Sequence, residues 1–62
     1  MTIITTAEKL KCAERELALR KRVYANRLET GRMSAGKVEH EIACMTAIIE
    51  DYKAAVEKER LI

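Results

Sequence analysis

Apolar residues recur at helical spacing through two stretches of the chain. At about 100° per residue, one face of the first stretch carries Leu10, Ala13, Leu17, Tyr24 and Leu28. A broader face of the second stretch carries Val38, Ile42, Met45, Ile49, Tyr52, Ala55 and Val56. The pattern predicts two long helices, over about residues 6–30 and 35–60.

Local signals mark where these helices should begin and end. Thr5 is followed three residues later by Glu8, which is the spacing of a capping box at a helix start. Gly31 suits the left-handed position that ends many helices, because glycine has no Cβ to clash there. Ser34 can cap the next helix. These residues predict an all-α, antiparallel two-helix hairpin forming one domain over residues 1–62.

Each helix has more apolar surface than a two-helix hairpin can cover. Additional apolar positions lie outside the two facing stripes: Cys12, Leu19 and Val23 in the first helix, and Cys44, Ile48, Ala54 and Leu61 in the second. Burial of apolar area contributes about 25 cal/mol per Å², so leaving these side chains in water forfeits stability that a small domain needs. We therefore expect two hairpins to pair into a four-helix bundle, or one hairpin to bind another protein, through these seven residues.

The composition agrees with long helices, and the distribution of charge allows two interpretations of the basic first helix. The chain has no Pro, Phe or Trp, and its 48% hydrophobic content argues against a disordered tail. Seven basic and three acidic residues in 11–32 give about +4, whereas three basic and six acidic residues in 38–62 give about −3. This asymmetry favours pairing of the two helices, with Arg20 and Arg27 as flanking ion-pair partners. The alternative is phosphate contact through Arg15 and Arg22, on the outward side of the first helix.

No combination of residues predicts catalysis, a metal or a cofactor. His40 and Cys44 are four residues apart, but two ligands do not make a metal site. A di-iron bundle needs Glu-x-x-His, and Lys37 stands three residues before His40. Cys12 and Cys44 should lie too far apart along the hairpin for a bridge within one chain, although a bridge between two chains stays open. We expect a protein that is not an enzyme and has no small-molecule substrate.

The sequence shows neither a targeting signal nor a membrane span. Residues 1–6 lack the basic region and apolar run of a signal peptide. No apolar stretch approaches the ~18 residues that a span requires. We expect a cytoplasmic protein.

Three segments resemble a group of bacteriophage proteins. They are Ala18–Tyr24, Gly31–Ser34 and Glu41–Tyr52, and the similarity covers about residues 8–53. They look like short uncharacterised helical-hairpin proteins encoded in phages and prophages of proteobacteria, a group with no assigned activity and hence no site residues to carry over. Related chains have a proline after the Val-Tyr pair, where this chain has Ala25. Because of this difference, we expect the first helix to run straighter than theirs. The resemblance implies a small accessory phage protein in a bacterial host cell, host-directed or regulatory.

The expected function is a non-enzymatic interaction or assembly module that uses exposed apolar helix faces. The alternative is a small nucleic-acid-associated regulator that uses the basic first helix.

Overall fold

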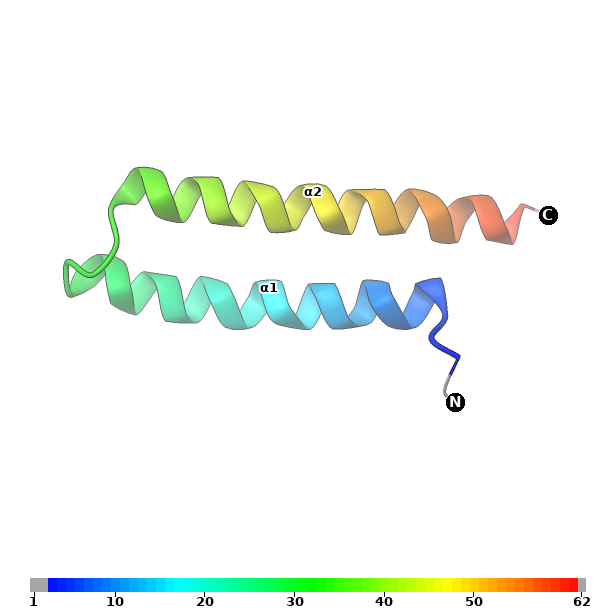
Figure 1. The fold of residues 1–62 in the computed structure, drawn as a ribbon, viewed down its shortest axis with the longest axis horizontal. Helices are drawn as coiled ribbons and strands as arrows, with labels where there is room; N and C mark the ends of the chain where they lie inside the picture. The colour runs from blue at the N-terminus through cyan, green and yellow to red at the C-terminus, as the bar shows by residue number, and fades with distance from the viewer. Residues whose placement is uncertain (1–2, 62) are drawn as a thin grey trace.

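The computed structural model describes residues 3–61 and contains two helices packed side by side in opposite directions (Figure 1). Helix α1 spans Thr6–Glu29 and helix α2 spans Ala35–Arg60. The predicted all-α antiparallel hairpin is confirmed, and the helix bounds agree with the prediction to within one residue. The molecule measures 47 × 24 × 14 Å, so it is a single layer of two helices.

Helix α1 begins at the capping box that the sequence predicts. The Thr5 hydroxyl accepts a hydrogen bond from the Glu8 backbone N–H at 3.1 Å. The Thr5 backbone N–H in turn donates to the Glu8 carboxylate at 3.4 Å. Two backbone donors that the first helical turn would leave unsatisfied thus find partners.

The turn between the helices depends on Gly31, whose φ is +75°. The Gly31 N–H donates to the Leu28 carbonyl at 3.2 Å, and the Arg32 N–H donates to the Arg27 carbonyl at 2.8 Å. These two bonds form a Schellman motif, which satisfies carbonyls at the end of α1 and reverses the chain. Helix α2 then begins where the Ser34 hydroxyl accepts from the Lys37 N–H at 3.2 Å.

The core lies between the two facing stripes and is small. Among the described residues only Met45 and Ile49 are buried, with 7% and 5% of their surfaces exposed. The other predicted stripe residues are half-buried, except Leu28, which is 45% exposed. Most of the stabilising contact is therefore made by side chains that still touch water.

One hydrogen bond shows how the two helices are aligned. The Thr6 hydroxyl donates to the Glu59 carboxylate at 2.8 Å, and it joins residues near the open end of the hairpin. Residues that lie level across the hairpin therefore have numbers that sum to about 65, as 6 and 59 do. Leu28 is level with Lys37, in the first turn of α2. Cys12 and Cys44 lie at different levels, and both are free and exposed.

Candidate docking surface

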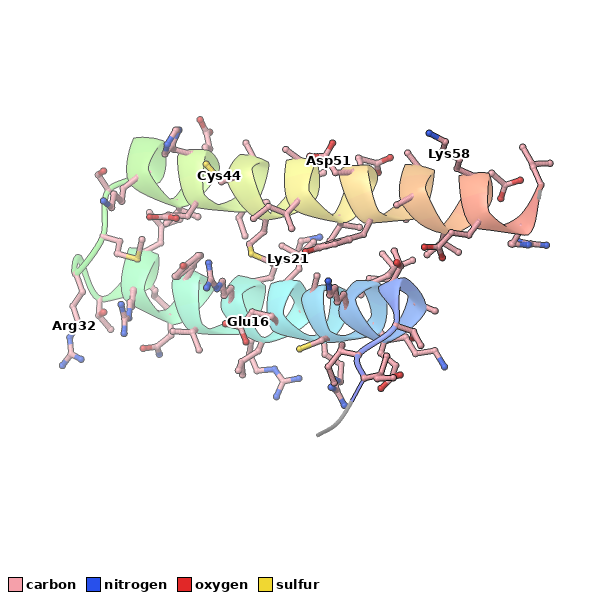
Figure 2. The ribbon with its side chains drawn as sticks, turned by 45° about the vertical axis from the view of Figure 1, so that its right-hand side comes forward. Glu16, Lys21, Arg32, Cys44, Asp51 and Lys58 are labelled. Atoms are coloured by element: carbon pink, nitrogen blue, oxygen red, sulfur yellow. The ribbon has the colours of Figure 1, made fainter. Side chains whose placement is uncertain are left out.

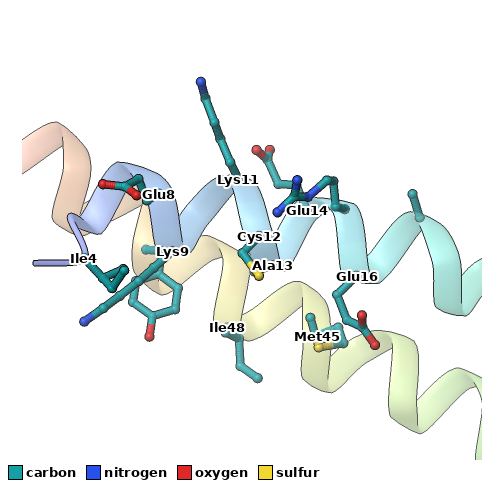
Figure 3. A pocket seen from close by; sticks show the side chains of 13 residues that line it. Ile4, Glu8, Lys9, Lys11, Cys12, Ala13, Glu14, Glu16, Met45 and Ile48 are labelled. Carbon is teal, nitrogen blue, oxygen red and sulfur yellow. The ribbon is translucent and has the colours of Figure 1, made fainter. Parts of the chain in front are cut away.

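A groove of about 1100 Å³ runs along one side of the hairpin. Its apolar lining includes Ile4, Cys12, Ala13 and Ala18 on the side of α1 and Met45, Ile48 and Tyr52 of α2. Figure 3 shows Cys12 and Ala13 on the side of α1 that is turned toward Met45 and Ile48, whereas Lys11 points away. The groove is open and is walled mainly by these two helices, with Ile4 before α1 at one end. It is therefore a surface for another helix rather than an enclosed chamber for a substrate.

A second hollow, of about 510 Å³, continues along α1 from the groove. Cys12, Ala18 and Leu19 form its apolar part, and Arg15 and Arg22 stand beside them. Leu19 is 50% exposed and Val23, four residues further on, is 37% exposed. The second apolar line predicted for α1 is thus a continuous exposed strip with arginines along one edge.

The groove places apolar lines from both helices on the same side of the hairpin. Cys12 and Ile48 line it together, and Cys44 lies about 40° from Ile48 around α2. We call the exposed residues that share this side the docking face; they are Cys12, Leu19, Val23, Cys44 and Ile48. It contains five of the seven residues that the sequence assigns to an interface.

The other two predicted interface residues lie elsewhere. Ala54 and Leu61 are about 120° and 140° from Ile48 around α2, and both are exposed. Neither lines the groove or the hollow along α1. The sequence pattern identified them correctly as surplus apolar positions, but it grouped them with Ile48 although they point in a different direction from α2.

The ion pairs show that the charged side chains associate mostly within each helix. Within residues 3–61, four pairs lie within 4.0 Å, and each joins residues three or four apart in one helix: Glu16–Arg20, Lys37–Glu41, Glu50–Lys53 and Glu57–Arg60. The prediction that Arg20 and Arg27 would form ion pairs with α2 is therefore wrong in its specific form. Residues three or four apart lie next to each other on the same helix, so oppositely charged side chains at this spacing are closer to each other than to charges on the other helix. The opposite net charges of the two helices thus remain available at the surface.

Arg20 makes the closest of these ion pairs at the edge of the docking face. Its Nε donates to the Glu16 carboxylate at 2.9 Å, and this hydrogen bond raises the pKa of Arg20 above its usual value. The charges of Tyr24, Glu16 and Glu41 act in the same direction, against a lowering by desolvation. The pair is neutral overall, so covering this edge would not bury a net charge.

His40 and Cys44 are in contact at the outer edge of the docking face on α2. The Cys44 Sγ lies 3.6 Å from His40 Nε2, a contact that their i, i+4 spacing on one helix allows. Within the described part of the chain, no three His, Cys, Asp or Glu side chains gather to hold a metal ion. The contact is a pair of side chains rather than a coordination sphere.

Two features of the surface could not be found by treating each helix alone. Met45 and Tyr52 belong to the stripe that faces α1, yet they also line the groove. Met33 lies in the turn and is nevertheless half-buried. The only sequence signal for Met33 is its place two residues after Gly31, since apolar residues just beyond a Gly-terminated helix often fold back onto the helix end.

The total surface of the chain is large for its mass. The accessible area is 5101 Å² for a chain of 7.1 kDa. A compact monomer of that mass exposes about 4100 Å² on the usual scaling of area with mass. The excess of about 1000 Å² is similar to the ~800 Å² that each partner contributes to a standard protein–protein interface.

Comparisons with protein-family models, with curated proteins and with solved structures give no match for this chain. Neither helix, as far as the structure describes it, has the length and apolar character needed to cross a membrane.

Proposed function

We propose that this protein is a small interaction or assembly module that binds another helical surface through its docking face and performs no catalysis. The observation that supports the proposal most directly is the groove, in which α1 and α2 present exposed apolar side chains on one side. A two-helix hairpin of 62 residues buries little of its own surface and gains stability when a partner covers the remainder. The resemblance to phage and prophage proteins suggests that it acts in the cytoplasm of a bacterial host.

The structure supports this proposal in its distribution of apolar surface. Two side chains are buried among residues 3–61, whereas Leu19, Val23 and Ile48 are between 37% and 50% exposed on one side. Exposed apolar side chains gathered on one side in this way are typical of a protein-binding surface. Its neighbours include charged residues that can form the polar rim of an interface.

The test is a charge placed on the docking face, with a matched charge placed elsewhere. Leu19→Lys should abolish complex formation by the tagged protein in bacterial cells, because the interface would have to bury an ammonium group. Ala25→Lys is the control, since Ala25 is exposed on α1 about 160° from Val23. Far-UV circular dichroism should show that both variants remain helical. Loss of the complex in both variants, or in neither, would contradict a role for the docking face.

The second candidate function is binding of nucleic acid through α1, and one observation favours it. Arg15 and Arg22 both stand beside the same hollow, where their guanidinium groups could contact successive phosphates. An electrophoretic shift of DNA or RNA that weakens steeply with salt and is lost in Arg15→Gln would support this function. A shift that survives Arg15→Gln, or no shift at low salt, would count against it.

A further inference from the structure

We infer that the partner on the docking face is a second copy of this chain, stacked so that α1 lies against α2 of the other copy and the two turns are at the same end. This inference rests on the proposed function and specifies its partner. It predicts an antiparallel contact between helices of different copies and a symmetric four-helix bundle.

The first argument is area. The accessible area of 5101 Å² exceeds that of a compact monomer of this mass by about 1000 Å². A layer only 14 Å thick has two broad sides, and the docking face occupies one of them. Stacking a second layer on that side would cover an area close to the ~800 Å² per partner of a standard interface. A second copy is the right size for this face.

The second argument is the charge of the two helices. Helix α1 carries seven basic and four acidic residues, a net of +3, and α2 carries four basic and six acidic residues, a net of −2. Because the ion pairs within 4.0 Å are formed within each helix, and in the described part of the chain only Arg20 also feels a charge of the other helix, that of Glu41, most of this opposition is not used up by the fold. The hairpin therefore presents a basic helix and an acidic helix side by side. When a second copy is turned over onto this surface, the basic helix of each copy can lie against the acidic helix of the other.

Two symmetric ways of stacking the docking faces are possible, and the charges distinguish them. A two-fold axis parallel to the helices sets α1 against α2 of the second copy, with the turns together. A two-fold axis perpendicular to the helices sets α1 on α1 and α2 on α2, with the turns at opposite ends. The first arrangement pairs net charges of opposite sign twice, whereas the second pairs like charges twice.

The third argument is the alignment of individual charges along the outer edges of the face. Figure 2 shows Cys44, Asp51 and Lys58 along the side of α2 that is turned away from α1. With the turns together, residues of the two copies that lie level again sum to about 65, as Thr6 and Glu59 do within one chain. Arg15 would then lie level with position 50 of the second copy, next to Asp51. Glu8 would lie level with position 57, next to Lys58. Both pairs have opposite charges, and the symmetry forms each of them twice.

The experiment is sedimentation equilibrium of the full chain with a charge exchange at one of these pairs. The wild type should be a dimer at tens of micromolar. Arg15→Glu and Asp51→Arg should each raise the dissociation constant of the dimer by about tenfold, because each replaces two attractions with two repulsions. The double variant should recover most of the affinity. Matched controls are Lys21→Glu and Glu50→Lys, which make the same charge changes away from the docking face.

The arrangement is tested by a distance between the turns. Arg32 extends from the turn into solvent (Figure 2) and can carry a spin label as Arg32→Cys in a chain with Cys12→Ala and Cys44→Ala. With the turns together, the two labels should be about 20–30 Å apart, given helix spacings of about 10 Å and the length of the labels. With the turns at opposite ends, their separation should approach the 47 Å length of the molecule. A long distance, or failure of the charge exchange to restore affinity, would overturn the inferred arrangement.

The outcomes also separate this inference from the proposed function. A wild-type chain that stays monomeric at hundreds of micromolar overturns the second copy as partner. If Leu19→Lys still abolishes a complex with another protein in cells, the docking face keeps its proposed function with a different partner. If Leu19→Lys affects neither association, both proposals fail.

Discussion

Two adjacent isoleucines on α2 should respond very differently to truncation. Ile49 is 5% exposed and lies in the core between the helices, whereas Ile48 is 43% exposed on the docking face. Isoleucine to alanine removes three methylene-sized groups, worth about 0.8 kcal/mol each when fully buried. Ile49→Ala should therefore cost about 2.4 kcal/mol plus a cavity contribution, or about 3 kcal/mol in total. Ile48→Ala should cost about 1.4 kcal/mol, because a little over half of its surface is covered and no closed cavity forms.

The measurement is urea unfolding of each variant, followed by far-UV circular dichroism at low micromolar concentration. A domain of this length has a free energy of unfolding of about 3–9 kcal/mol, so Ile49→Ala should approach the limit at which the chain folds at all. Repeating the measurement at high concentration adds a second comparison, since covering of the docking face should increase the cost of Ile48→Ala. Equal costs for the two variants in dilute solution would refute the packing described for α2. A larger cost for Ile48→Ala there would refute it as well.

The remaining predictions concern local structure and exposure. Gly31→Ala should destabilise the chain by about 1 kcal/mol in the same assay, because the φ of +75° is unfavourable for alanine. Gly36→Ala should stabilise it by about 0.5 kcal/mol, since an added Cβ meets no atom within 4 Å and glycine disfavours helices; a loss of stability would contradict the helical placement of Gly36. Thr5→Ala should cost about 1 kcal/mol through loss of the cap, seen as a lower unfolding midpoint, and an unchanged midpoint would mean that the first turn does not depend on the capping box. Cys12 and Cys44 should both react with a thiol reagent in the folded, dilute protein; a thiol that reacts only in denaturant would show that its helix face is covered.

Local signals in the sequence were sufficient for the helices and the turn. The capping box at Thr5 and Glu8 places the start of α1, and the glycine at position 31 places its end. Such signals work within a few residues, because they depend on backbone groups that the helix itself leaves unsatisfied. The apolar period likewise identified Met45 and Ile49 as part of the face that meets the other helix. These two residues are the ones that are buried in the described part of the chain.

The sequence was less informative about how charged residues and surplus apolar residues are arranged. It suggested that Arg20 would form an ion pair with α2, but the structure pairs it with Glu16 in its own helix. It grouped Ala54 and Leu61 with Ile48, although the turn of the helix separates them from it by more than 100°. In both cases the sequence correctly showed the character of a residue, charged or apolar. It did not show which other residue would lie next to it in the folded chain.

What the sequence by itself determined is therefore the set of local choices: two helices, their ends, the reversal at Gly31 and the apolar character of each face. What only the tertiary structure decided is which side of α1 shares a surface with which side of α2. The physical reason is that periodicity fixes the angle between residues around one helix axis but not the rotation or level of one helix against another. The rotation of each helix and its alignment along the other helix are set by the packing of the facing stripes. The Thr6–Glu59 hydrogen bond shows the alignment that results. That packing brings Cys12 and Ile48 together at one groove and so creates the docking face.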